Sequence, residues 1–159
     1  MDNVFEYVTD TSTICVFDIA NLKHRLDDTC DWWSIPEDEV LELNKGNLFI
    51  AALPADGKYE VSILDEFCCS YDFHLSANLN CNSGEIFIGA GEHITGDEAE
   101  PKDWKYLAGR QINIEPGSYK VDLYLSEKSK IAVKFTKNSD VKLNDFLLPL
   151  ELRDKQWSI

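Results

Sequence analysis

The residues of this chain that could do chemistry are three histidines, five cysteines and a large excess of carboxylates. His24, His74 and His93 are scattered and belong to no nucleophile-elbow, metalloprotease or phosphate-loop pattern. The cysteines are odd in number and lack the C-x-x-C spacing of zinc and redox sites. We therefore predict no catalytic residue, no metal and no cofactor. We expect a protein that is not an enzyme and that keeps its thiols reduced.

One histidine lies close to carboxylates in the sequence, which suggests a metal or acid–base hypothesis. His93 follows Glu92 and precedes Asp97, Glu98 and Glu100. This order lacks the alternating oxygen ligands of a calcium loop, and no second histidine is near in the sequence. We favour a solvated acidic loop, and we keep its acids as a secondary candidate for contact with a partner.

Acidity is the strongest feature of the composition. The chain has 29 acids and 15 bases, a formal net charge of -14. Residues 1–100 hold 21 acids and 4 bases, whereas residues 101–159 hold 8 acids and 11 bases. Such a field repels nucleic acids and anionic membranes and attracts basic proteins. We therefore predict a basic protein partner, with no direct nucleic-acid ligand and no membrane association.

The densest acidic window runs from residue 27 to 42, where seven acids surround a tryptophan pair and no base intervenes. Ser34, Pro36 and Glu37 match a capping box, which predicts a helix over about 35–43 and explains part of the charge. Two adjacent tryptophans of an extended segment point in opposite directions, so we expect one of them at a partner interface. The alternative, that both pack over the core, stays open.

The predicted partner-binding surface therefore has a main part in this window and a second part in the loop 92–100. Its residues are Asp27, Asp28, Asp31, Trp32, Trp33, Glu37, Asp38 and Glu42, followed by Glu92, Asp97, Glu98 and Glu100.

The elements that must position these residues show mostly a period of two. Residues 109–137 predict a hairpin with its turn at Pro116-Gly117 and a third strand at 131–135, and residues 46–64 predict another hairpin. A short helix is predicted over 19–26, and the last strand, 146–152, contains Pro149 and is expected at a sheet edge. The chain is therefore mainly β, an antiparallel β-sandwich over 1–159 with one or two short helices in its N-terminal third.

An internal echo links the two predicted hairpins. The stretch GKYEVSI, from Gly57, aligns with GSYKVDL, from Gly117, so that a tyrosine follows each glycine by two positions. Shared turn chemistry is the favoured interpretation, and an internal duplication remains open. The sequence has no apolar run of about 18 residues and no signal-peptide pattern near residue 1, so we predict a cytoplasmic protein.

A family resemblance is carried by residues 17–47 (FDIANLKHRLDDTCDWWSIPEDEVLELNKGN), by DGKYEV at 56–61 and by INIEPGSYKVDLYL at 112–125. Together these stretches resemble a family of uncharacterised bacterial domains found near polymorphic toxin and secretion loci. More distantly, the last stretch and Asp31-Trp32 are similar to competence protein J, an acidic β-sandwich that inhibits a secreted DNA nuclease. The resemblance implies an immunity or inhibitor protein that neutralises a basic toxin, with a nuclease as one candidate.

Two other classes of function remain open at this point. A carbohydrate- or ligand-binding β-sandwich would use exposed tryptophans over a concave sheet. A structural or oligomeric module would bury the tryptophan pair in a self-contact. The sequence predicts neither the oligomeric state nor the identity of the toxin.

Overall fold

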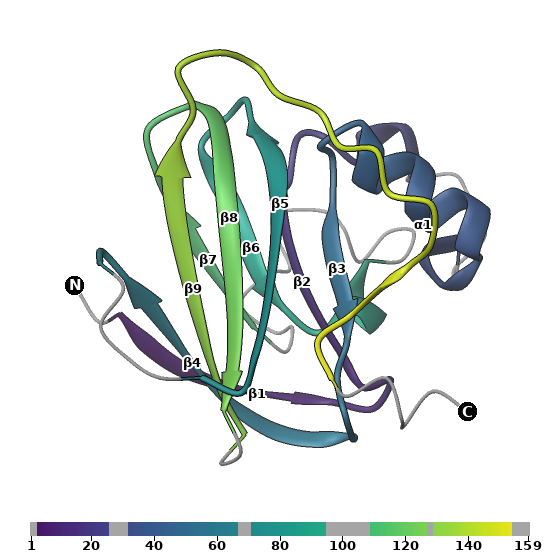
Figure 1. Ribbon diagram of the computed structural model, residues 1–159, viewed down its shortest axis with the longest axis vertical. Helices are drawn as coiled ribbons and strands as arrows, with labels where there is room; N and C mark the ends of the chain where they lie inside the picture. The colour runs from purple at the N-terminus through teal and green to yellow at the C-terminus, as the bar shows by residue number, and fades with distance from the viewer. Residues whose placement is uncertain (1–2, 26–31, 67–70, 95–108, 127–128, 154–159) are drawn as a thin grey trace.

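The computed structural model describes residues 3–25, 32–66, 71–94, 109–126 and 129–153, and within these ranges two five-stranded sheets pack face to face (Figure 1). Sheet A contains, in spatial order, β1 (Val4–Thr9), β4 (Gly57–Leu64), β9 (Lys130–Lys137), β8 (Gly117–Ser126) and β5 (Phe73–Cys81). Sheet B contains β10 (Leu150–Glu151), β3 (Phe49–Ala52), β2 (Thr13–Asp18), β6 (Glu85–Gly89) and β7 (Gly109–Asn113). The predicted mainly-β sandwich is confirmed.

The sheets are mixed, which corrects the expectation of a purely antiparallel sandwich. β4 pairs with β9 in parallel, and the two-residue strand β10 pairs with β3 in parallel. The other pairs are antiparallel. The strand predicted over 146–152 is reduced to β10, and Pro149 precedes it instead of interrupting it. β10 lies at the edge of sheet B, as predicted.

The two predicted hairpins do not exist as such, because the chain changes sheet at each predicted turn. β7 pairs with β6 in sheet B, while β8, which follows the Pro116-Gly117 turn, pairs with β5 and β9 in sheet A. In the same way β3 belongs to sheet B and β4 to sheet A. An alternating pattern fixes which side of a strand is buried, but it does not say which strand is the neighbour.

The sequence echo marks these sheet-to-sheet corners. Tyr59 Oη donates a hydrogen bond to Ala55 O at 2.7 Å, and Tyr119 Oη donates to Glu115 O at 2.6 Å. In both corners the hydroxyl reaches the carbonyl four residues upstream, as in the tyrosine corner of other sandwiches. The shared turn chemistry is thus visible in the structure as a repeated corner.

The main core lies between the sheets, and a second core covers the outer face of sheet B. Along β2, Ile14 and Val16 point into the main core, whereas Cys15 and Phe17 point into the second. The second core is closed by Trp32 and other side chains from outside the sheets. Since β2 is buried on both faces, it is apolar almost throughout, unlike β1 of sheet A, in which exposed and buried residues alternate.

The helical segments are short. They are η1 (Lys23–Arg25), η2 (Trp32–Ser34), α1 (Pro36–Asn44) and η3 (Gly91–His93). α1 confirms the helix predicted over 35–43, but its N-cap is Ile35 and carries no side-chain hydrogen bond, so the predicted capping box is wrong. The predicted helix over 19–26 is described as far as residue 25 and has only the single 3-10 turn η1. None of the helices in the described ranges has the length and apolar content needed to span a membrane.

Candidate partner-binding surfaces

The tryptophan pair lies inside the molecule. Trp32 is 1% exposed and Trp33 is 9% exposed, and both pack in the second core with Phe17 and Phe87 of sheet B. The expectation that one of the pair presents its ring to a partner is therefore wrong. The physical reason is the outer face of sheet B, whose apolar side chains need a cover that α1 alone does not provide.

Glu42 also lies inside, within a cluster of charges held by η1 and α1. Its side chain is 1% exposed, and its carboxylate accepts hydrogen bonds from Arg25 Nε at 2.9 Å and Asn47 Nδ2 at 2.9 Å. His24 Nε2 lies 2.8 Å from the same carboxylate. The Arg25 guanidinium stacks on the Trp32 ring, 4.6 Å from its centre. Glu42 thus supports the fold, which corrects its prediction as a surface contact.

The cluster sets the ionisation of Glu42. Burial alone raises the pKa of this carboxyl, but the hydrogen bonds from Asn47, His24 and Arg25 outweigh burial and hold the pKa below its ordinary value. Glu42 is therefore a buried carboxylate that stays ionised and interacts with Arg25 and His24 instead of solvent.

The remaining acids of the main predicted surface differ in accessibility. Glu37 is exposed on the first turn of α1. Asp38 is half-buried and pairs with Arg25 Nη1 at 3.2 Å. Asp27, Asp28 and Asp31 lie outside the described residues. Glu37 is therefore the acid of this window that the described structure presents freely to solvent.

The second predicted cluster begins with an acid that is committed to the fold. The carboxylate of Glu92 accepts hydrogen bonds from Thr9 Oγ1 at 2.7 Å, Asp10 N at 2.6 Å and Thr11 Oγ1 at 2.6 Å. Burial raises its pKa, but these bonds outweigh burial and leave the pKa below the ordinary value. Glu92 fixes the β1–β2 turn. The other acids of this cluster, Asp97, Glu98 and Glu100, lie outside the described residues.

Sheet A carries a polar cluster on its outer face that sequence reasoning missed. His74 Nε2 lies 2.8 Å from Asp122 Oδ1 and 3.3 Å from Ser76 Oγ, and Ser76 also donates a hydrogen bond to Asp122. The His74 ring stacks on Tyr124 at 4.5 Å. Because the serine and the aspartate approach the same ring nitrogen, this imidazole cannot relay a proton between them as a catalytic triad does. In the part of the chain that the structure describes, no cluster of three or more metal-ligating side chains is found.

The largest missed feature is a strap, residues 138–149, that connects β9 to β10 and passes beside α1 (Figure 1). The Asn144 side chain donates to Leu43 O at 2.7 Å and to Asn78 O at 2.8 Å, and it accepts from Asn78 N at 2.8 Å. The Asn44 side chain donates to Phe146 O at 3.0 Å and accepts from Phe146 N at 2.7 Å. The side-chain amides of Asn44 and Asn144 thus each donate to and accept from backbone groups, as the backbone of a neighbouring strand would. These bonds attach the strap to β5 and α1.

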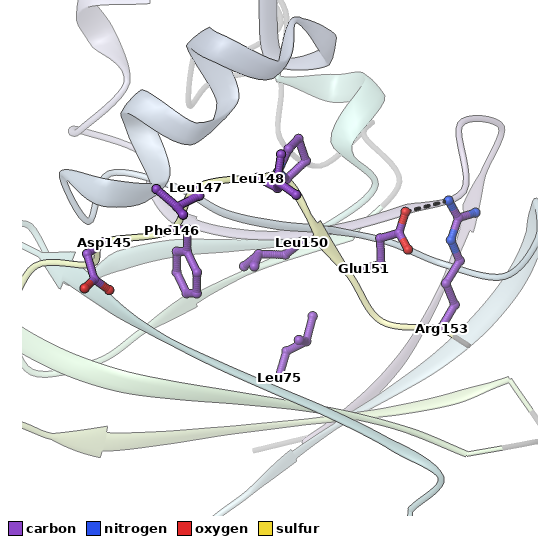
Figure 2. A pocket seen from close by; sticks show the side chains of 9 residues that line it. Leu75, Asp145, Phe146, Leu147, Leu148, Leu150, Glu151 and Arg153 are labelled. Carbon is purple, nitrogen blue, oxygen red and sulfur yellow. Dashed lines mark hydrogen bonds and ion pairs between the residues drawn. The ribbon is translucent and has the colours of Figure 1, made fainter. Parts of the chain in front are cut away.

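A groove of about 840 Å³ opens between the strap and the edge strand β5. Phe146 of the strap and Leu150 of β10 face Leu75 of β5 across it (Figure 2). Besides Leu75, the groove is lined by residues 145–151 and Arg153. Arg153 forms an ion pair with Glu151 at 3.1 Å.

Comparison with known proteins relates residues 1–148 to a family and most of the chain to two solved structures. A family model described as a family of unknown function, DUF6386, matches residues 1–148. No curated protein sequence matches significantly. One similar solved structure, "Crocagin biosynthetic gene J", has a TM-score of 0.57 and 11% identity, and covers 85% of this chain and 94% of that chain. Another is ComJ from Bacillus subtilis, described as an inhibitor of the DNA degrading activity of NucA. It has a TM-score of 0.53 and 13% identity, and covers 85% of this chain and 95% of that chain.

These likenesses establish a shared fold. The identities of 11% and 13% are too low to show more than the fold, which this chain shares with both solved structures over most of their lengths. The distant resemblance to competence protein J that the sequence suggests is thereby supported at the level of the fold.

Proposed function

The chain belongs to the DUF6386 family, a family of unknown function, and we propose that it is an inhibitor that binds and neutralises a basic protein toxin, with a nuclease as the first candidate. The observation that carries the proposal is the fold shared with ComJ, which inhibits the DNA degrading activity of NucA. The proposal further specifies that the chain is an immunity protein and that its partner is a bacterial toxin.

The charge of the chain supports the same partner class. A nuclease holds a polyanion and therefore has a basic cleft, which an acidic protein can occupy through the same cations. With a net charge of -14, this chain would be steered towards such a cleft and away from nucleic acid itself.

The acids proposed to meet the toxin are the exposed Glu37 and those acids of the two predicted clusters that lie outside the described residues. They are Asp27, Asp28, Asp31 and Glu37, with Asp97, Glu98 and Glu100 as the second group. Trp32 and Trp33 instead pack η2 on sheet B, and Glu42 ties α1 to η1. The carbohydrate-binding alternative relied on exposed tryptophans over a concave sheet, and the burial of Trp32 and Trp33 excludes these two rings from that role.

Co-expression tests the proposal. Each reading frame beside the gene is expressed in a bacterial host, alone and together with the chain. We expect a neighbouring frame that is lethal alone and harmless with the chain. Val121→Asp, which places a charge in the main core, provides an unfolded control that should not rescue growth. Equal toxicity with and without the chain would refute the inhibitor role.

Charge reversal tests the proposed surface separately. Asp27→Lys, Asp28→Lys and Asp31→Lys together should lower the association rate with the toxin about tenfold and weaken its salt dependence. The same change of net charge at Asp65, Glu66 and Glu85, exposed acids elsewhere, provides the control. If both triple variants associate equally fast, the first surface is not the contact.

A further inference from the structure

The strap exposes more apolar surface than the fold requires. Among the described residues, eight large hydrophobic side chains are exposed, and the four most exposed belong to the strap. They are Val141 at 73%, Leu143 at 62%, Leu147 at 91% and Leu148 at 73%. Four exposed apolar side chains within the eight residues 141–148 mark a contact site more often than scattered single residues do.

The exposed side chains sit on backbone that is held in place. The asparagine amides of positions 44 and 144 bond the strap to α1 and β5, and Lys142 N and Asn138 N bond to Ser118 of β8. A surface fixed before binding loses little conformational entropy on binding. The strap therefore presents its leucines in a preorganised way.

The shape of this surface indicates a protein as its occupant. A small molecule could fill the groove between Phe146 and Leu75, but it would leave Val141 and Leu143, which do not line the groove, in water (Figure 2). A protein surface can insert an apolar side chain into the groove and also cover the leucines on its rim.

The charges indicate which kind of protein surface fits. Asp145 is exposed in the groove lining, and Glu151 is paired within the chain by Arg153. A second copy of this chain would bring another net charge of -14 to the contact, which opposes self-association. A partner with lysines or arginines around its apolar residues would complement Asp145 and the overall field.

We propose that the strap and its groove form a docking site for a partner protein that inserts an apolar side chain flanked by basic residues. The site takes its partner class, a basic protein, from the proposed inhibitor function. It lies on the strap and β5, whereas the acids proposed above lie before and within α1 and after η3. The toxin would thus be held by an apolar anchor as well as by charge.

Fluorescent peptides of defined sequence test this site directly. The probe carries leucines and a phenylalanine flanked by lysines. One control peptide replaces the apolar residues by serine, and the other replaces the lysines by glutamate. Affinity is measured by fluorescence anisotropy for the wild type, for Leu147→Ser with Leu148→Ser, and for Val4→Ser with Val8→Ser. The last pair are exposed aliphatic residues of β1, on the outer face of sheet A.

We expect the wild type to bind the apolar-basic probe about tenfold more tightly than either control peptide. The Leu147/Leu148 variant should lose about tenfold in affinity for the probe, and the Val4/Val8 variant should bind it as the wild type does. Equal binding by both variants, or equal binding of the serine peptide, would overturn the site. So would a wild-type dimer in light scattering that the Leu147/Leu148 variant abolishes. Growth rescue in the co-expression assay without any of these peptide differences would refute the docking site and leave the inhibitor role intact.

Discussion

Single acidic residues of this chain have two different roles: some stabilise the fold, and others are exposed and could contact a partner. Glu42 and Glu92 are charged but enclosed by donors, whereas Glu37 stands in solvent on the same helix as Glu42. The count of carboxylates in the 27–42 window could be taken from the sequence, but their division between fold and surface could not. That division depends on the positions of Arg25 and His24 across space, which periodicity does not specify.

Replacement of Glu42 by glutamine should lower the free energy of unfolding by about 3 kcal/mol, because it leaves Arg25, which is 12% exposed, without its main anion. Urea unfolding at neutral pH measures the effect, and Glu37→Gln is the control with an expected change below about 1 kcal/mol. Since the pKa of Glu42 is lowered, its stabilisation should persist above the ordinary carboxyl value of 4.5 and disappear as pH falls through the lowered pKa. Equal losses in the two variants would argue against the buried cluster.

Glu39 should act on stability in the opposite direction. Burial raises its pKa from 4.5 to about 7. Between these values the unfolded chain has released a proton that the folded chain keeps, so stability should fall as pH rises through this window. Glu39→Gln should remove this slope and stabilise the protein at pH 8 by about 2 kcal/mol, a figure reduced for the partial exposure of the side chain. Parallel pH profiles for wild type and variant would show that Glu39 titrates normally.

At the scale of elements, the positions of the strands could be predicted from the sequence much better than the way the strands pair with one another. Residues 119–125 alternate as expected, and Val121, Leu123 and Leu125 enter the main core. The turns before β4 and β8 were predicted to close hairpins, but they are corners between sheets. Turn residues such as Pro116-Gly117 allow both outcomes, and the choice depends on which sheet edge each strand can reach.

The repeated corner gives a test at this scale. Tyr59→Phe and Tyr119→Phe each remove one hydrogen bond to backbone and should each cost about 1 kcal/mol in urea unfolding. Because the corners are separate, the double variant should show the sum to within about 0.5 kcal/mol. A cost in one variant but not in the other would mean that the corners are not equivalent.

The strap could not be predicted from the sequence, which indicates a strand at residues 146–149, because its anchors are asparagine side chains that bond to distant backbone. Asn144→Ala should detach it and speed hydrogen exchange of the Asn78 amide, whose acceptor is Asn144 Oδ1, while the amide of Val121 stays protected. Asn144→Asp should behave similarly, since a carboxylate can accept from Asn78 N but cannot donate to Leu43 O or Asn78 O. Unchanged exchange at Asn78 in both variants would contradict the described anchoring.

At the scale of the whole molecule, a mainly-β sandwich and a strongly acidic protein could both be predicted from composition and alternation. The sequence alone pointed to a function through the acidic window and its tryptophans. The structure moves the tryptophans into the core and reveals an apolar strap instead, so the proposed partner contact combines charge with an apolar anchor. The oligomeric alternative would appear as a dimer in light scattering, which the net charge of -14 opposes.

The most direct test of the central claim is a titration of the purified toxin nuclease with the chain, followed by the rate of plasmid DNA degradation. If the chain is a stoichiometric inhibitor, the rate should fall linearly and reach zero at a molar ratio of about one, as expected when the concentrations far exceed Kd. The plasmid itself should show no binding to the chain. Degradation that continues unchanged in the presence of a large excess of folded chain would contradict the account.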